Sequence, residues 1–398
     1  MNRQLFGAIF LVAGTCIGAG MLALPVATSG AGFFLSVLLL IVVWLLMSFT
    51  GLLVVEASLR LPEGTSFISM SEQTLGPIGK TVTWFCFILL LYSLLAAYFA
   101  GGGAVVHAVE ELYLRRPVQS WMSYVPWLIV FSIIVYFGIT VTDLLNRFLV
   151  LGLVGTFVAL VLTTVPHVHL HLLTGFHHKY LLATLPILFA SFGYHVILPS
   201  LRTYLKSHVR HLKTAVVGGG AVALLMYFVW SVIVFGLIPT SGPNGLIAIL
   251  HAGYPTAQIV SALAAFTQNF WIVSIARFFI FFAIASSFLG VSLGLFDLLA
   301  DGLKIKKDEK GRGILAVLTF LPPFLFALFF PTGFVLALSY AGVLVAILHG
   351  ILPALMAWRG RYSQKLQSPY VVWGGRWALI FVMLCSLVVI FSQLKFHA

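Results

Sequence analysis

The sequence predicts an all-α polytopic membrane protein with about eleven transmembrane helices, and three observations carry this prediction. Hydrophobic residues make up 61% of the 398-residue chain, and charged residues only 8%. Soluble domains carry about a quarter charged residues, so this chain lacks the polar surface needed to face water on all sides. The apolar residues also gather in runs long enough to span a bilayer, and Lys and Arg concentrate in alternate links between the runs.

The predicted spans are the apolar runs, because a membrane-spanning helix needs about 20 mostly apolar residues. Two links between the runs are long. Residues 57–79 predict a short surface helix, and residues 239–270 form an uncharged connection with a partly inserted helix near 256–268. In order, the runs lie at about 6–28, 32–56, 80–106, 122–141, 147–166, 180–200, 213–238, 271–299, 313–331, 333–357 and 371–393.

The positive charge predicts the orientation of the chain. The net charge of +12 would indicate nucleic acid in a soluble protein, but no basic patch here is interleaved with aromatic residues. With the N-terminus in the cytoplasm, 17 of the 22 Lys and Arg residues fall on the inner side and four on the outer side, as the positive-inside rule predicts. Arg277 lies within the eighth run, and the four on the outer side are Arg115, Arg116, Lys179 and Lys395.

The first apolar run contains a weak point. Three glycines stand within seven residues of the stretch 14–20 (GTCIGAG), and Pro25 follows. Each glycine costs about 1 kcal/mol relative to alanine in a helix interior, and proline removes a backbone donor. Inside a bilayer, irregular backbone persists only where protein or a water-filled cavity satisfies it.

The sixth run repeats this pattern. It reads PILFASFGYH over 186–195, and Pro199 follows Gly193 after six residues. Small residues that let helices pack closely would explain one such run. A pair of interrupted runs at corresponding positions instead predicts a transporter built from inverted repeats. We expect repeat one at about 6–166, repeat two at about 180–357 and an additional helix at about 371–393, in a single domain over 1–398.

Broken helices predict a particular binding chemistry. The free amides at the start of a half-helix suit a carboxylate, and the free carbonyls at the end of another suit an ammonium group or a metal cation. A zwitterionic amino acid matches both ends without a charged side chain from the protein. This agrees with the scarcity of charge within the runs.

Five motifs in order resemble those of the aromatic amino acid permeases, in the amino-acid/polyamine/organocation superfamily, and among them the tyrosine-specific bacterial members. The resemblance runs essentially end to end and implies a LeuT-type five-plus-five fold with broken helices 1 and 6. It also implies import of an aromatic amino acid, with tyrosine as the main expected substrate, by cation symport through alternating access in the bacterial inner membrane. The motifs are 13–25 (AGTCIGAGMLALP), 146–148 (NRF), 191–195 (SFGYH), 286–297 (SSFLGVSLGLFD) and 319–323 (TFLPP).

The resemblance also implies which residues meet the substrate. The backbone of the first interruption would hold the carboxylate, the second interruption would receive the amino group, and aromatic side chains would line the ring. The residues for the carboxylate are Gly18, Ala19 and Gly20. Those for the amino group are Phe189, Ala190 and Ser191. Those for the ring are Tyr194, Phe192, Tyr92 and Tyr98.

The coupling cation remains open between a proton and sodium. Many proton-coupled transporters that this sequence resembles carry a lysine in the fifth helix. By this resemblance the lysine would stand at about Leu153, and the fifth run has no lysine there. Sodium would use oxygen ligands, namely the Ser286 and Ser287 hydroxyls with the carbonyls of Gly14 and Ile17. A proton is favoured by the family resemblance, and its candidate carriers are His195, Asp143, Glu56 and Asp297.

Three function classes compete. A secondary transporter accounts for the paired interruptions. A membrane-embedded enzyme would need clustered catalytic groups, and a channel would need rings of polar residues along a pore. We therefore expect a transporter for tyrosine, with tryptophan or phenylalanine as alternative substrates. We expect no enzymatic activity, resident cofactor, bound metal, nucleic acid or obligate protein partner besides the lipid bilayer.

Three further features carry weaker expectations. Arg277 is expected to reach the outer interface or line the outer vestibule rather than bind substrate. Asp143 and Arg147 are four residues apart and predict an ion pair at the inner face. The histidines of 167–178 are expected in an outer loop rather than at a metal, because they have no acidic or cysteine partner nearby.

Overall fold

The computed structural model describes the chain except for residues 1, 115–119, 174, 176–180, 252–254 and 398. Within this described part every regular element is a helix. Side chains begin two of the long helices: Asn269 accepts hydrogen bonds from the amides of Trp271 and Ile272, and Asp308 accepts one from Gly311. These caps satisfy amides that the first turn of a helix leaves free.

The helices of the first half include the interrupted first span. Cys16 ends one helix, Ala19 begins the next, and the two are bent by 55°. The helices are α1 (Asn2–Cys16), α2 (Ala19–Ala27), α3 (Phe33–Leu59), α4 (Phe67–Leu114), α5 (Ser120–Tyr136) and α6 (Ile139–Thr164), with short turns η1 (Ser29–Ala31) and η2 (Val165–His167).

The second half includes the interrupted sixth span and two π-helical segments. The helices are α7 (Leu181–Ser191), α8 (Leu198–Tyr204), α9 (Val209–Leu237), α10 (Leu246–His251), α11 (Pro255–Thr267), α12 (Phe270–Leu303), α13 (Glu309–Phe329), α14 (Phe334–Val345), α15 (Leu352–Trp358) and α16 (Gly375–His397). The shorter segments are η3 (Leu170–Leu172), η5 (His195–Ile197) and the π-helical η6 (Ala346–Ile351) and η7 (Arg359–Ser363).

The described helices include nine that are long and apolar enough to span a membrane, and the bent pair α1–α2 makes a tenth. The run expected at 122–141 corresponds to α5, which has 17 residues. The count of eleven therefore stays a prediction. Both long links contain a helix where one was expected. Residues 67–75 form the first part of α4, which a kink at Gly76 (φ 81°) separates from the rest, and α10 and α11 lie within 239–270.

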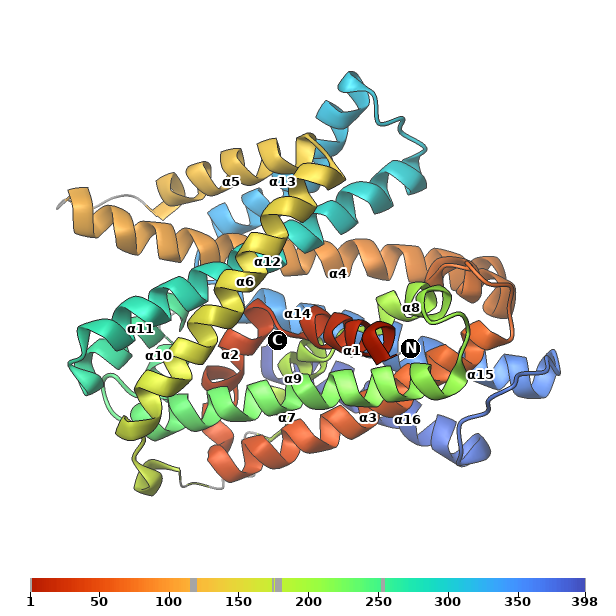
Figure 1. Cartoon of the computed structure of the whole chain (residues 1–398), viewed down its shortest axis with the longest axis horizontal. Coiled ribbons are helices and arrows are strands. Elements are labelled where there is room, and N and C mark those ends of the chain that lie inside the picture. The colour runs from red at the N-terminus through yellow and green to blue at the C-terminus, as the bar shows by residue number, and fades with distance from the viewer. Residues whose placement is uncertain (1, 115–119, 174, 176–180, 252–254, 398) are drawn as a thin grey trace.

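The helices pack in two groups with α1, α2 and α14 between them. Figure 1 shows α4, α5, α12 and α13 in the upper half of the view and α3, α9 and α16 in the lower half. Helix α12 packs on α4 and α6, α9 packs on α1 and α3, and α14 packs on both α4 and α7. The two interruptions therefore lie between these groups.

One face of α6 shows how the outer surface suits lipid. Leu144, Leu151 and Leu162 are each at least 70% exposed and lie seven and eleven residues apart on one side of the helix. A soluble protein would expose few such contiguous apolar side chains. This pattern supports a bilayer as the surrounding solvent.

Candidate functional site

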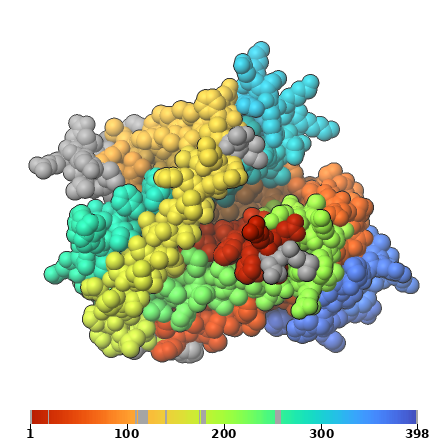
Figure 2. All heavy atoms as spheres, viewed as in Figure 1, coloured from red at the N-terminus to blue at the C-terminus, as the bar shows by residue number. Residues whose placement is uncertain are grey.

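The first interruption separates α1 from α2 in the middle of the molecule (Figure 1). Gly18 precedes α2 in an extended conformation (φ −166°, ψ −155°), and no side chain caps the amides that follow it. Figure 2 shows α1 at the surface of the front face, with the surface recessed just above it. The amide of Met21 donates to the Gly18 carbonyl at 3.0 Å, and the start of α2 presents its other first-turn amides and the positive end of a helix dipole.

The second interruption separates α7 from α8. Helix α7 ends at Ser191, and helical structure resumes with η5 at His195. The carbonyls of the last turn of α7 lose their usual partners at such an end. Pro199 near the start of α8 fits this arrangement, because proline lacks the amide that the first turn of a helix leaves free.

Tyr227 on α9 ties the two interruptions together. Its hydroxyl lies 2.6 Å from the carbonyl oxygen of Cys16, the last residue of α1, and 2.6 Å from that of Ser191, the last residue of α7. A phenol has one hydrogen, so Tyr227 donates to one carbonyl at a time. The side chain is fully buried, and its ring packs at 5.2 Å against that of Phe192. One hydroxyl therefore fixes the distance between the carbonyl ends of both broken helices.

Two glycines let the first interruption approach its neighbours. A Cβ added at Gly18 would lie 2.3 Å from Ser287 Oγ on α12, closer than real contacts allow. A Cβ at Gly20 would lie 3.6 Å from Ser191 Oγ, an ordinary contact. The backbone of 18–20 therefore lies against α12 on one side and against the second interruption on the other.

Tyr98 on α4 completes this cluster. Its buried hydroxyl interacts with that of Ser287 on α12, which also donates to the carbonyl of Ala283 at 2.8 Å. The arrangement brings together five predicted site residues from four elements: Gly18, Gly20, Ser191, Tyr98 and Ser287. We call these five residues, with Tyr227, the interruption site.

The other predicted aromatic residues lie differently. Tyr92 donates from α4 to the carbonyl of Leu318 on α13 at 2.6 Å, and Tyr194 donates to that of Met47 on α3 at 3.0 Å. Phe192 packs on Tyr227, and Phe189 is buried in the core. The described contacts therefore bring Tyr98 to the interruption site and direct Tyr92 and Tyr194 toward neighbouring helices.

The remaining predicted binding residues have local partners. Ala190 is half-buried, and its carbonyl lies 3.2 Å from a Cβ added at Gly193. Ser286 donates within α12 to Ala283 at 3.3 Å, and the amide of Ile17 still donates to Ala13 at 2.9 Å. Gly14 is exposed, and a Cβ there would meet nothing within 4 Å. For Ala19 the described part of the chain includes the backbone only.

Three of the four candidate proton carriers are engaged by cations. Asp143 pairs with Arg147 at 2.7 Å as expected, and both side chains are more than half exposed. Asp297 pairs with Lys307 at 2.7 Å. Glu56 is fully buried and paired with two arginines, as described next. His195 is the fourth candidate, and it is fully buried beside the second interruption.

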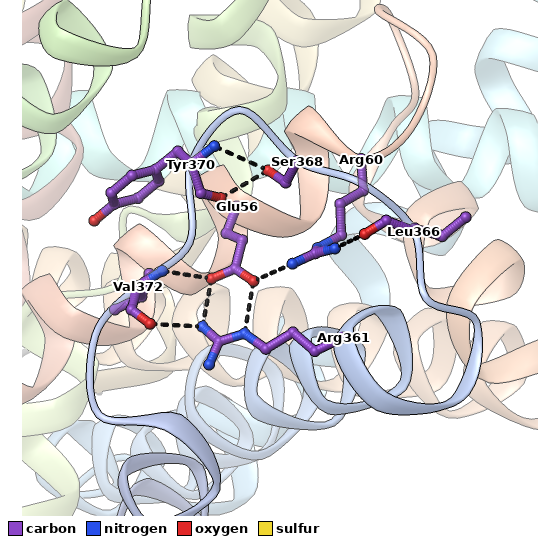
Figure 3. A network of polar contacts seen from close by, with 7 residues as sticks. All are labelled: Glu56, Arg60, Arg361, Leu366, Ser368, Tyr370 and Val372. Carbon is purple, nitrogen blue, oxygen red and sulfur yellow. Dashed lines mark hydrogen bonds and ion pairs between the residues drawn. The ribbon is translucent and has the colours of Figure 1, made fainter.

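Glu56 on α3 anchors the chain segment that leads into α16 (Figure 3). Its carboxylate accepts from Arg60 at 2.7 Å, from both the Nε and Nη2 of Arg361, and from the amide of Val372 at 2.8 Å. The same arginines reach the carbonyls of Leu366 and Val372. Burial and the nearby Glu56 carboxylate raise the pKa of Tyr370, so its phenol stays neutral. Glu56 thus joins helices far apart in the sequence.

Arg277 and the histidine segment lie apart from the interruption site. The side chain of Arg277 is exposed on α12. His167, His169 and His171 are exposed, and His177 and His178 fall outside the described residues. The described His, Cys, Asp and Glu side chains include no group of three or more arranged to hold a metal ion.

Sequence reasoning missed three residues that the structure brings to the interruptions: Tyr227, Thr50 and His349. His195 is 2.8 Å from the Thr50 hydroxyl, and its ring stacks on that of His349. A search for ionisable residues inside predicted spans would have found His349 within 333–357. Tyr227 gives a weaker signal, because a tyrosine in an apolar run is usually a packing residue.

Comparison with known proteins identifies the family of the chain. The tryptophan/tyrosine permease family model matches residues 1–393. The tyrosine-specific transport system 1 of Haemophilus influenzae is 33% identical over 392 residues, which cover 98% of this chain and 96% of the relative. The tryptophan-specific transport protein of the same organism is 34% identical over 406 residues, covering 99% and 96%.

The fold has a solved counterpart. The crystal structure of MhsT in complex with L-phenylalanine matches with a TM-score of 0.64 at 14% identity, covering 97% of this chain and 98% of that one. This match shows the LeuT-type fold expected for the chain. The relatives are permeases and transport proteins rather than enzymes. On this evidence the chain is a membrane transporter that belongs to the tryptophan/tyrosine permease family.

Proposed function

We propose that this permease imports an aromatic amino acid, with tyrosine as the main substrate, across the bacterial inner membrane by proton symport and alternating access. The observation that carries the proposal is the position of Tyr227, whose hydroxyl lies 2.6 Å from the terminal carbonyl of both broken helices. Binding or release of substrate at one interruption therefore affects the other through this shared hydroxyl. Alternating access moves one group of helices against another around a fixed site, and substrate sites in such folds lie at the broken helices.

The start of α2 supplies the proposed carboxylate site. Its amides are free of side-chain caps, and the dipole of the helix favours an anion there. The hydroxyl of Tyr98 lies beside Gly18 through Ser287, and we propose that its single hydrogen is donated to the carboxylate when the substrate binds. The carbonyl end of α7 and the Ser191 hydroxyl face the amino group. Replacing Tyr98 with Phe should raise KM for tyrosine in uptake assays about tenfold, the cost of one charge-assisted hydrogen bond.

The substrate class is proposed from the named relatives, which include tyrosine-specific and tryptophan-specific transport proteins at similar identity. A competition panel against labelled tyrosine uptake tests it. Tyrosine, tryptophan and phenylalanine should compete, whereas leucine should not. If leucine competes as well as tyrosine, the aromatic assignment is wrong.

Proton coupling is proposed because Asp143, Glu56 and Asp297 are each held by a basic side chain, which leaves His195 as the candidate beside an interruption. Sodium is the second candidate, supported by the approach of Ser287 to Gly18. Uptake into proteoliposomes with imposed gradients separates them. Uptake that follows sodium and ignores a pH gradient would contradict the proton.

The proposed orientation places the N-terminus in the cytoplasm. The positive-inside distribution of Lys and Arg supports it. A reporter fused after residue 393 should then lie outside the cytoplasm if the chain spans the membrane eleven times. A cytoplasmic reporter there would contradict either the count or the orientation.

A further inference from the structure

Two histidines from distant parts of the chain stack face to face in the membrane interior. His195 begins the segment η5 after the second interruption, and His349 lies in the π-helical segment η6 between α14 and α15. Their ring centroids are 4.5 Å apart and their planes differ by 12°. The side chains are 0% and 1% exposed. Buried ionisable groups within a membrane span are expensive and are usually functional.

The hydrogen bonds around the pair leave room for a proton. The Thr50 hydroxyl lies 3.1 Å from the Met47 carbonyl, to which it donates, so it accepts from His195 Nε2 at 2.8 Å. Nε2 then carries the hydrogen, and Nδ1 of His195 presents a bare lone pair. Neither Nδ1 of His195 nor either ring nitrogen of His349 has a hydrogen-bond partner among the described atoms. The rings therefore offer basic nitrogens that the fold does not otherwise use.

The groups facing the pair are mostly uncharged. Tyr194 stacks on His195 at 4.7 Å, and its phenol is bound to Met47. Phe67 of α4 packs edge-on against His349. On α3, Glu56 lies six residues beyond Thr50 and is paired with Arg60 and Arg361. Helix α16 packs on η6; it carries the thiol of Cys385 near its middle and the charged Arg376 and Lys395 near its two ends. No charged partner among the described residues therefore holds either histidine in one protonation state.

The pair touches the interruption directly. A Cβ added at Gly193 would lie 3.8 Å from Cε1 of His349, so His349 packs against the non-helical residues between α7 and η5. The other side of the contact is a π-helix, a form that is rare and frequently marks functional sites. A charge placed on the rings acts at the junction between the second interruption and α14–α15.

We propose that the stacked His195–His349 pair is the proton-binding site of the symport and that it takes up one proton per substrate. The inference rests on the proposed function and adds His349, Thr50 and a stoichiometry to it. The proton adds to a free ring nitrogen from outside and leaves from the same nitrogen inside, with no covalent change. Two adjacent imidazolium rings would repel each other, which limits the pair to one added proton.

Proteoliposomes containing the full chain provide the test, with the membrane potential held at zero by potassium and valinomycin. One proton per tyrosine predicts about tenfold accumulation for a pH difference of about one unit, acid outside. His195→Gln and His349→Gln should abolish this accumulation and retain measurable tyrosine exchange. His208 and His211 also stack, at 4.1 Å, but on the surface, so His211→Gln is the matched control and should accumulate tyrosine like wild type.

The outcomes separate the inference from the proposed function. If wild type accumulates no aromatic amino acid in any gradient, the proposed function fails and the inference with it. If wild type follows the pH gradient and both histidine variants do too, only the role of the pair is overturned. Histidine variants that lose tyrosine exchange while remaining folded and able to bind tyrosine would also overturn it. The rings would then be needed for movement of the substrate itself and not only for proton coupling.

Thr50 offers a second route if the histidine variants fail to fold. Thr50→Val removes the oxygen that accepts from Nε2, and this hydrogen bond favours the charged ring. The pH midpoint of uptake should therefore move about one unit toward acid. Thr50→Ser keeps the hydroxyl and should retain the wild-type midpoint. An unchanged midpoint in Thr50→Val would overturn the proposal.

Discussion

Gly18 brings the first interruption against the Ser287 side chain of α12. A Cβ added at Gly18 would lie 2.3 Å from Ser287 Oγ, whereas its extended backbone is open to any residue on conformational grounds. Glycine is therefore required at this position because its lack of a side chain lets the first interruption lie against α12. Backbone flexibility is not the reason.

Gly18→Ala should reduce tyrosine transport about tenfold, because the added Cβ must displace the Ser287 hydroxyl from its hydrogen bond to Ala283 at the edge of the first interruption. Ser287→Gly in the same chain should restore part of the activity by removing the atom that clashes. Gly14→Ala is the control, since a Cβ there meets open space. Equal losses at Gly14 and Gly18 in an uptake assay would contradict the contact argument.

Tyr227→Phe removes one hydroxyl and leaves the ring in place. The carbonyls of Cys16 and Ser191 lose a shared donor in a buried site, which should cost about 1–2 kcal/mol in the free energy of unfolding. Transport should fall as well, because the two interruptions are no longer linked. Tyr340→Phe on the exposed face of α14 should change neither thermal stability in detergent nor uptake. A Tyr227→Phe protein with wild-type stability would show that the link contributes little.

At the scale of elements, the Glu56 network joins α3 to the segment that leads into α16. Its carboxylate accepts from two guanidinium groups and one amide in a site where the carboxylate is fully buried. Such a group is costly to leave half-paired, whereas exposed ion pairs contribute little. The network therefore fixes η7 and the following segment against the helix that contains Thr50.

Glu56→Gln should lower the free energy of unfolding by about 3–5 kcal/mol, because two buried arginines lose their counter-charge. Asp143→Asn removes an exposed pair and should cost at most about 1 kcal/mol. Thermal unfolding in detergent compares them directly. Similar melting temperatures for the two variants would show that Glu56 is not an anchor.

The sequence predicts the elements better than their contacts. The glycines at 14–20 and the prolines at 25 and 199 predict both interruptions, because a helix in a bilayer tolerates them only at special places. Tyr227 meets Cys16 across 211 residues of chain and Ser191 across 36. Which side chain crosses that distance depends on the rotation and packing of each helix. These are properties of the assembled structure and not of any local pattern.

At the scale of the whole molecule, hydropathy and the scarcity of charge predict the membrane class and the all-helical fold. The exact number of spans does not follow from hydropathy alone, because α5 at 17 residues is close to the shortest length that can cross a bilayer. The same scarcity of charge explains why the interruption site is built from backbone and hydroxyl groups. A zwitterionic substrate can be met there without an ionised side chain.

The central claim is that the broken helices form an aromatic amino acid site in a proton-coupled transporter. Counterflow of labelled tyrosine in proteoliposomes loaded with unlabelled tyrosine tests the site most directly, with the experiment repeated for Gly18→Ala and Gly14→Ala. We predict saturable counterflow in wild type and Gly14→Ala, inhibition by tryptophan but not by leucine, and loss of counterflow in Gly18→Ala. Counterflow that leucine abolishes, or that Gly18→Ala leaves intact, would contradict the account.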